Sequence, residues 1–142
     1  MKCSRCSVED ILPLRHKVLR EGKPLDTARF DGDHGEGVLH YGLFTDDSVI
    51  VCLTLIPSQM DGNKAWQLRG MATDTRFQGM GLGGRLIEFA LKDSQSESYS
   101  NQFWCNARKV AVNFYRKHSW EIFSDEFDVP GIGPHYKMKI SV

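Results

Sequence analysis

An apolar, strand-like run is joined to an amphipathic helix pattern by the segment Thr73-Asp74-Thr75-Arg76-Phe77-Gln78-Gly79-Met80-Gly81-Leu82-Gly83-Gly84-Arg85. Four of the six residues at positions 79–84 are glycine, although a glycine inside a helix costs about 1 kcal/mol relative to alanine. Glycines let a ligand approach the backbone closely, and the free N–H groups at a helix N-terminus bind anionic oxygens with help from the helix dipole. The segment therefore predicts a cradle for a phosphate or pyrophosphate group. The alternative is a glycine-rich turn packed against a neighbouring strand.

The pattern of apolar residues around this segment predicts a mixed α/β order. Ser7 is expected to cap a first helix, and the polar, glycine-rich residues 21–37 are expected to form a loop. The dipeptide Asp46-Asp47 is expected to join two strands into a hairpin. Strands are expected over residues 38–45, 48–56, 65–73, 102–105, 121–129 and 135–140, and further helices over residues 79–91 and 107–118. The second of these helices is expected to bury Val110, Ala111, Phe114 and Tyr115 on one stripe.

Length and composition limit the class of protein. The chain has 142 residues, so we expect a single domain over residues 1–142. Its 18 basic and 18 acidic residues give a formal net charge of +0, which lacks the basic field of a general nucleic-acid binder. No apolar run approaches the roughly 20 residues that span a membrane, and the N-terminus shows no apolar signal region. We therefore expect a cytoplasmic protein with neither nucleic acid nor membrane as a partner.

The four cysteines point to no strong metal or redox chemistry. Cys3 and Cys6 have a spacing that suits zinc or a redox pair. A structural zinc site needs a second pair of ligands, and Cys52 and Cys105 stand alone in apolar runs. We therefore expect no metal and four free thiols in a reducing compartment.

Three phosphate-binding motifs compete for the glycine-rich segment. A P-loop requires Gly-Lys-Ser/Thr, whereas Arg85 and Leu86 follow Gly84 here. The dinucleotide fingerprint G-x-G-x-x-G is matched by Gly79, Gly81 and Gly84, but no acidic residue ends the next strand. A nicotinamide-dependent enzyme therefore stays an alternative that a lack of NAD binding would exclude.

The third motif is carried by two segments in a fixed order. The pattern Gln78-x-x-Gly81-x-Gly83 resembles the Gln/Arg-x-x-Gly-x-Gly/Ala signature of GNAT-type N-acetyltransferases. Residues 111–120, AVNFYRKHSW, resemble that family's Ala-x-x-x-Tyr-x-x-x-Gly-Phe helix and turn. The resemblance implies a GNAT acyl-CoA N-acyltransferase fold: a central, mostly antiparallel twisted sheet, splayed at its middle strands and flanked by helices.

The resemblance implies acetyl-CoA as the cosubstrate. It places the pyrophosphate on backbone N–H groups of the glycine-rich loop, and the pantetheine arm along the preceding strand. The implied binding residues are Met71, Ala72, Thr73, Gln78, Gly79, Met80, Gly81, Leu82, Gly83, Gly84, Asn106 and Asn113. A backbone N–H near Met71 or Ala72 would polarise the acetyl carbonyl. Gln78 stands where the family more often has arginine, so one phosphate contact is expected to be neutral.

The resemblance also implies catalytic roles. Tyr115 matches the family's general acid, which protonates the departing CoA sulfur. The central strand lacks the glutamate that many members use as a base, so we expect a water chain, with His135 as the best side-chain candidate. His34, His40 and His118 have no comparable context in the sequence. Ser119 replaces the usual glycine after the second helix, and it is strained if that turn needs a positive φ.

These features together predict an N-acetyltransferase. It would move an acetyl group from acetyl-CoA to a primary amine of a small molecule or peptide, by direct transfer in a ternary complex. The alternative is a weak or inactive GNAT-fold module that binds CoA as a sensor. Acidic residues in the expected acceptor loops would suit a cationic acceptor; they are Asp31, Asp33, Glu36, Asp125, Glu126 and Asp128, and Arg29 lies among them. Dimers are common in the family, so the resemblance is compatible with a homodimer.

Overall fold

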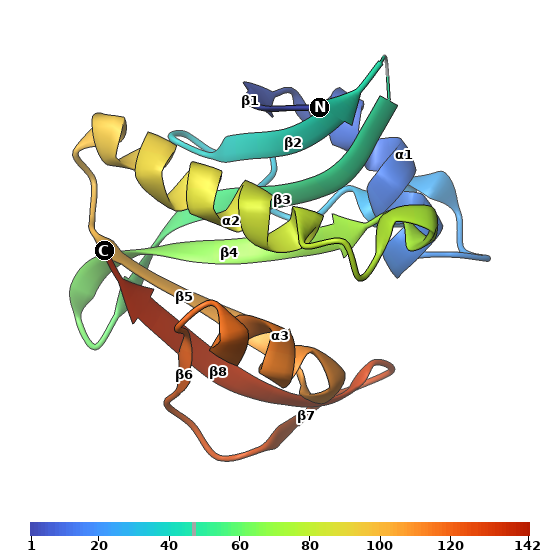
Figure 1. Ribbon diagram of the computed structural model, residues 1–142. Coiled ribbons are helices and arrows are strands. Elements are labelled where there is room, and N and C mark those ends of the chain that lie inside the picture. The colour runs from blue at the N-terminus through green and yellow to red at the C-terminus, as the bar shows by residue number, and fades with distance from the viewer. Residues whose placement is uncertain (47) are drawn as a thin grey trace. The chain divides into compact units, whose positions relative to one another are not determined.

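A computed structural model describes residues 1–46 and 48–142, which form two compact units. The first unit comprises Met1–Ile56 and Arg69–Ser98, and the second comprises Pro57–Leu68 and Tyr99–Val142. Figure 1 shows the strands and helices of both units. The strands are β1 (Lys2–Cys6), β2 (Leu39–Thr45), β3 (Ser48–Met60), β4 (Asn63–Thr73), β5 (Gln102–Arg108), β6 (Glu121–Ile122), β7 (Phe127–Val129) and β8 (Gly133–Ser141). The α-helices are α1 (Val8–Leu19), α2 (Leu82–Asp93) and α3 (Val112–Lys117), and the 3-10 helices are η1 (Leu25–Ala28), η2 (Thr75–Phe77), η3 (Ser94–Glu97) and η4 (Lys109–Ala111).

The first unit is a sheet in the order β1-β2-β3-β4 with helix α1 on one face and helix α2 on the other (Figure 1). Strand β2 shows why both faces are covered, because successive side chains of a strand point to opposite sides. His40 bonds to the segment that follows α1, through the Asp33 carbonyl, whereas the ring of Tyr41 contacts Phe89 of α2 at 6.0 Å between ring centres. Strands β1–β2 and β2–β3 pair antiparallel.

Helix α1 begins where the sequence predicts. Ser7 and Asp10 form a capping box, in which each side chain accepts from the other residue's backbone N–H. The helix then buries Val8, Ile11, Leu12 and Leu14 in a core that also holds Ala28, Cys52 and Ala72. This packing places the chain after α1 against strands β3 and β4.

The second unit contains the remaining strands and helix α3. β8 pairs antiparallel with β5, β6 and β7. Strand β4 runs parallel to β5 and pairs with it over Trp66–Leu68 and Phe103–Cys105 alone. The mostly antiparallel sheet is therefore splayed at its middle strands, as the family resemblance predicts.

Several element boundaries differ from the predictions. The N-terminal residues 2–6 form an edge strand that the polar sequence KCSRC did not indicate. Helix α2 starts at Leu82, three residues after the expected start, because Gly79 and Gly81 have positive φ. Strand β5 and η4 take residues expected to be helical, and Val110 is 92% exposed, so its assignment to the buried stripe was wrong. Asp47 of the expected hairpin turn lies outside the described residues.

The closing strands are also divided differently from the expectation over residues 121–129 and 135–140. The first splits into β6 and β7, and the last begins at Gly133.

Within the described residues, none of the helices combines the length and the apolar character needed to cross a bilayer. The expectation of one domain over residues 1–142 stays a prediction.

Candidate active site

The glycine-rich loop owes two of its glycines to backbone conformation. Gly79 has φ +78° and Gly81 has φ +75°, a left-handed region that L-residues rarely adopt. A Cβ added at either position would meet no atom within 4 Å. These glycines are therefore needed for the path of the loop, and the space beside them stays open.

The loop ends in a helix N-terminus without a side-chain cap. Gly81 is the N-cap residue of α2, and no side chain accepts a hydrogen bond from the first turn. The first intrahelical bond of this turn runs from the Arg85 N–H to the Gly81 carbonyl (3.2 Å). The preceding N–H groups, at Leu82, Gly83 and Gly84, lie at the positive end of the helix dipole, where an α-helix provides them no partner. This arrangement fits an anionic ligand such as a pyrophosphate.

The strand that leads into the loop has an unusual conformation at Gly70. Its φ of +64° lies in the left-handed region although the residue is inside β4. A Cβ there would meet the Arg15 Nε at 2.9 Å and the Phe30 ring at 3.1 Å. Glycine is therefore required by both conformation and space, directly before Met71, Ala72 and Thr73. Left-handed glycines inside strands are typical of bulges, which redirect the backbone next to active sites.

Asp74 connects this strand to the loop. Its carboxylate accepts from the backbone N–H of Arg76 at 3.0 Å and from the Arg76 side chain at 3.1 Å, and Lys17 approaches it at 3.4 Å. The Arg76 hydrogen bonds hold the pKa of this buried carboxyl well below its usual range. A pocket of about 330 Å³ opens here; its lining is Asp10, Pro13, Leu14, Lys17, Phe44, Ser48, Val49, Asp74 and Arg76. None of the predicted CoA-binding residues lines it. The amide of Gln78 donates to the Thr73 carbonyl at 3.3 Å.

Tyr115 belongs to the second unit, where α3 holds it almost entirely buried at 5% exposure. Its ring makes edge contacts with Phe114 and Trp120. Burial and the Cys105 contact raise the pKa of Tyr115 well above its ordinary value. The phenol therefore stays protonated through the neutral pH range.

His135 lies on β8 of the same unit, where it pairs with Arg108 of β5. The Nδ1 atom lies 2.8 Å from the Gly133 carbonyl. Because a carbonyl only accepts, this contact places the proton on Nδ1 and leaves a lone pair on Nε2 in the neutral ring. The side chain is 6% exposed and tilts against the Phe127 ring.

The two predicted asparagines are both exposed in the second unit, Asn106 on β5 and Asn113 on α3. The predicted site residues thus divide between the units. The first unit brings Met71–Thr73 and the glycine-rich loop together along a continuous stretch of chain, and the second holds Asn106, Asn113, Tyr115 and His135.

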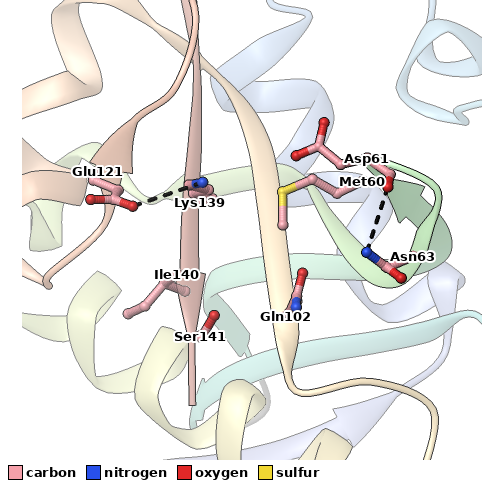
Figure 2. A pocket seen from close by; sticks show the side chains of 8 residues that line it. All are labelled: Met60, Asp61, Asn63, Gln102, Glu121, Lys139, Ile140 and Ser141. Atoms are coloured by element: carbon pink, nitrogen blue, oxygen red, sulfur yellow. Dashed lines mark hydrogen bonds and ion pairs between the residues drawn. The ribbon is translucent and has the colours of Figure 1, made fainter.

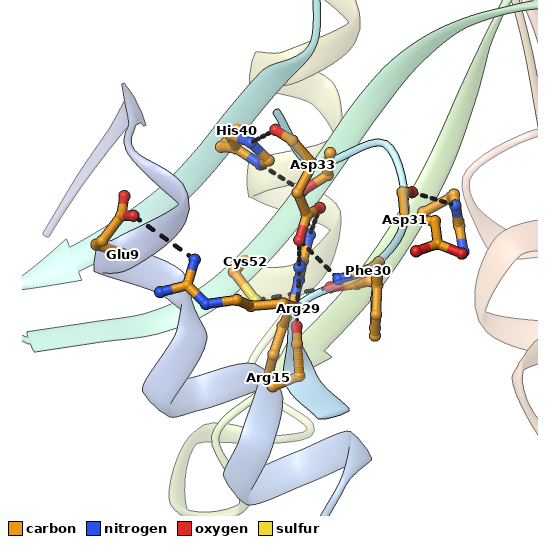
Figure 3. Close-up of polar contacts among 12 residues, drawn as sticks. Glu9, Arg15, Arg29, Phe30, Asp31, Asp33, His40 and Cys52 are labelled. Atoms are coloured by element: carbon orange, nitrogen blue, oxygen red, sulfur yellow. Dashed lines mark hydrogen bonds and ion pairs between the residues drawn. The ribbon is translucent and has the colours of Figure 1, made fainter. Parts of the chain in front are cut away.

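The loop before β2 contains a buried ionic network that the sequence did not indicate (Figure 3). Arg15 is fully buried and contacts both carboxylate oxygens of Asp33, at 2.7 and 3.0 Å. It also donates to Thr54 at 2.7 Å, and His40 bridges Thr54 (2.8 Å) and the Asp33 carbonyl (2.9 Å). Asp33 is therefore buried in an ion pair with Arg15. Its inclusion among the acidic loop residues that would bind a cationic acceptor was wrong. His40, which had no context in the sequence, is a structural residue.

A second pocket, of about 310 Å³, lies in the second unit away from the predicted motifs (Figure 2). Its lining is Met60, Asp61, Asn63, Gln102, Glu121, Lys139, Ile140 and Ser141.

All four cysteines are free thiols. Among the described residues, no cluster of three or more His, Cys, Asp or Glu side chains could hold a metal ion.

Known proteins resemble this chain along most of its length. A family model described as an acetyltransferase (GNAT) domain matches residues 28–142. A Bacillus subtilis (strain 168) protein described as "Uncharacterized N-acetyltransferase YitI" is 35% identical over 135 residues, which cover 93% of this chain and 90% of that protein.

Solved structures share the fold at low sequence identity. An acyl-CoA N-acyltransferase from Pseudomonas aeruginosa has a TM-score of 0.78 at 17% identity, covering 98% of this chain and 99% of that one. An aminoglycoside 6'-N-acetyltransferase complexed with coenzyme A has a TM-score of 0.78 at 13% identity, covering 99% and 97%. The two sequence motifs, the splayed sheet and the match over residues 28–142 lead to one conclusion: this chain belongs to the GNAT family of acetyltransferases.

Proposed function

We propose that this protein transfers the acetyl group of acetyl-CoA to a primary amine, by direct transfer in a ternary complex. The observation that carries the proposal is the left-handed turn at Gly79 and Gly81, which opens into the uncapped N-terminus of α2. Backbone N–H groups at such a terminus suit the two phosphates of CoA. Membership of the GNAT family supports acetyl-CoA rather than a nicotinamide cofactor as the ligand.

The strand before this loop has a role in the same proposal. Met71, Ala72 and Thr73 would pair with the pantetheine arm, and the N–H of Met71 or Ala72 would donate to the acetyl oxygen as negative charge develops on it. The left-handed φ at Gly70 supports this assignment, since it changes the direction of the backbone directly before Met71. Asn106 and Asn113 remain candidates for contacts with the pantetheine amides.

The proposed reaction has two steps, addition of the amine to the thioester and loss of the CoA thiolate. The neutral amine attacks the thioester carbon, the carbonyl electrons move to oxygen, and their return breaks the C–S bond. The nitrogen releases one proton to water, which leaves an amide, and the CoA thiolate takes the proton of the Tyr115 hydroxyl, which regains a proton from water. The CoA thiol is a fair leaving group, with a pKa of about 8.5. We therefore assign the larger share of the rate to holding amine and thioester together.

The amine must lose a proton before it attacks. Water is the first candidate for this step, and His135 is the side-chain candidate. The Nδ1 contact with Gly133 supports His135, because it leaves Nε2 of the neutral ring as the basic atom.

The test uses turnover of acetyl-CoA with a panel of primary amines, read as free thiol. Tyr115→Phe removes the acidic proton but keeps the buried ring, so kcat should fall about 10- to 100-fold, while acetyl-CoA binding stays unchanged. Tyr136→Phe is the matched control, since that hydroxyl donates to exposed Glu126 at 3.2 Å. Equal kcat for wild type and Tyr115→Phe would remove Tyr115 from the mechanism.

A further inference from the structure

Arg69 bears a charge without a carboxylate partner beside the segment proposed to hold the thioester. It lies on β4, two residues before Met71. Its Nη1 donates to the Asp31 carbonyl at 3.2 Å, and its guanidinium carbon lies 5.5 Å from the centre of the Phe30 ring. Among the described residues, no carboxylate comes within the 4.0 Å of an ion pair with it. Figure 3 shows Phe30 and Asp31 in the loop before β2.

The same phenyl ring gathers two further guanidinium groups. Arg15 lies 4.3 Å and Arg20 lies 5.0 Å from the centre of the Phe30 ring. Arg15 is paired with Asp33, whereas the guanidinium of Arg69 lies near the same ring with a backbone carbonyl as its hydrogen-bond partner. Like charges that converge in a half-buried place repel each other, and an anion bound there would relieve the repulsion.

Two of the nearby carboxylates are paired with arginines other than Arg69. Asp33 forms an ion pair with Arg15, and Glu9 forms one with Arg29 at 3.6 Å. Asp31 contacts Arg69 through its backbone carbonyl, while its side chain is exposed. The surroundings of β4 therefore favour an anionic group over the cationic acceptor that the loop sequence suggested.

We propose that the acceptor is an amine that also carries a carboxylate, and that Arg69 binds this carboxylate. The inference rests on the proposed function, because it takes Met71 and Ala72 as the place of the acetyl group. Only Gly70 separates Arg69 from Met71, so the two residues are at most about 7 Å apart along the strand, at roughly 3.3 Å per residue, which suits an amino-acid-sized acceptor. An arginine has five N–H donors, and Asp31 takes one of them. The rest of the planar fork matches the two oxygens of a carboxylate.

The test measures binding of CoA conjugates, so it needs no known acceptor. The CoA sulfur is joined through –CH2–CO–NH– to a chain of one, three or five methylenes that ends in a carboxylate or in the matching carboxamide or ammonium. Calorimetry gives the Kd of each conjugate and of CoA for wild type, Arg69→Gln and Arg69→Lys. Arg29→Gln is the control, because Arg29 is the chain neighbour of Phe30 but pairs with Glu9.

At the best chain length, the carboxylate conjugate should bind wild type about 10- to 100-fold tighter than its carboxamide. Arg69→Gln should bring that ratio close to one, Arg69→Lys should keep part of it, and Arg29→Gln should keep all of it. CoA should bind the four proteins equally, which also shows that the variants are folded. Equal binding of carboxylate and carboxamide at every length, tighter binding of the ammonium, or an unchanged ratio in Arg69→Gln would overturn the inference alone. Failure of CoA to bind wild type would overturn the proposed function, and the inference with it.

Discussion

Ser119 shows how one residue can depart from its family pattern at a cost in stability. The Trp120 N–H bonds to the Tyr115 carbonyl at 3.1 Å and the Ser119 N–H to the Arg116 carbonyl at 3.0 Å. These two bonds form a Schellman motif, which requires a left-handed residue at the Ser119 position. Ser119 has φ +72°, so the strain foreseen from the sequence is present.

Ser119→Gly should therefore stabilise the protein. An L-residue in the left-handed region destabilises the folded state by about 1–2 kcal/mol. Glycine removes this strain, but part of the gain is offset because glycine loses more conformational entropy on folding. We expect the free energy of unfolding to rise by about 1 kcal/mol in urea titrations. Ser119→Ala keeps the strain and serves as the control. A gain in Ser119→Ala as large as in Ser119→Gly would show that backbone conformation is not the cause.

A comparison of alanine substitutions at Gly81 and Gly62 separates the effect of backbone strain on stability from an effect on acetyl-CoA binding. Both have positive φ, +75° and +79°, and an added Cβ would meet no atom within 4 Å at either position. Alanine at either position should lower the free energy of unfolding by about 1 kcal/mol. Only Gly81→Ala should weaken acetyl-CoA binding, by about tenfold, because it shifts the N–H groups of the cradle. Calorimetry with acetyl-CoA and urea titration of both variants check this. Equal Kd values for acetyl-CoA in Gly81→Ala and Gly62→Ala would contradict the proposal that the loop at Gly81 binds the pyrophosphate.

At the scale of elements, a directed hydrogen-bond chain ties the loop after α1 to strands β2 and β3. The Asp33 carbonyl only accepts, so the His40 Nε2 donates to it, and Nδ1 of the neutral ring accepts from the Thr54 hydroxyl. Thr54 in turn accepts from Arg15. A proton on Nδ1 would break this chain. Burial lowers the pKa of His40, and Arg15 and His34 act in the same direction against the opposing effect of Asp33.

The lowered pKa predicts a loss of stability in mild acid. Neutral His40 contributes its full stabilisation above the unfolded-state pKa of about 6.5, and this is lost as the pH falls through the lower folded-state pKa. The free energy of unfolding should therefore decrease from pH 7.5 to pH 5. In His40→Gln the decrease should be smaller. Urea titrations at four pH values across this range measure both slopes, and parallel profiles for the two proteins would exclude His40 as the source.

Helix α3 illustrates what periodicity can and cannot predict. Tyr115 is buried and Val112 is buried, as a helical stripe requires. The residues before Val112 belong to β5 and η4, because Asn106, Ala107 and Arg108 pair with β8. That pairing depends on residues about 30 positions away, so local spacing could not show where the strand ends.

For the molecule as a whole, the family, the mixed sheet and the glycine-rich turn before α2 could be predicted from the sequence. These follow from local features: left-handed glycines, capping residues and two motifs in order. The Arg15–Asp33–His40 network could not be predicted, because its members contact one another across loop and strands rather than at a sequence spacing. The same holds for Arg69, whose neighbours Phe30 and Asp31 lie far away along the chain. Edge strand β1 was missed because its polar sequence lacks the apolar alternation of a strand.

The most direct test of the account is isothermal titration of the purified wild-type protein with acetyl-CoA, with NADH as the control ligand. We expect a Kd in the micromolar range for acetyl-CoA and no binding of NADH, since the strand after α2 ends without the acidic residue that a nicotinamide site requires. Absence of acetyl-CoA binding would contradict the account, and the turn at residues 79–84 would then have only a structural role.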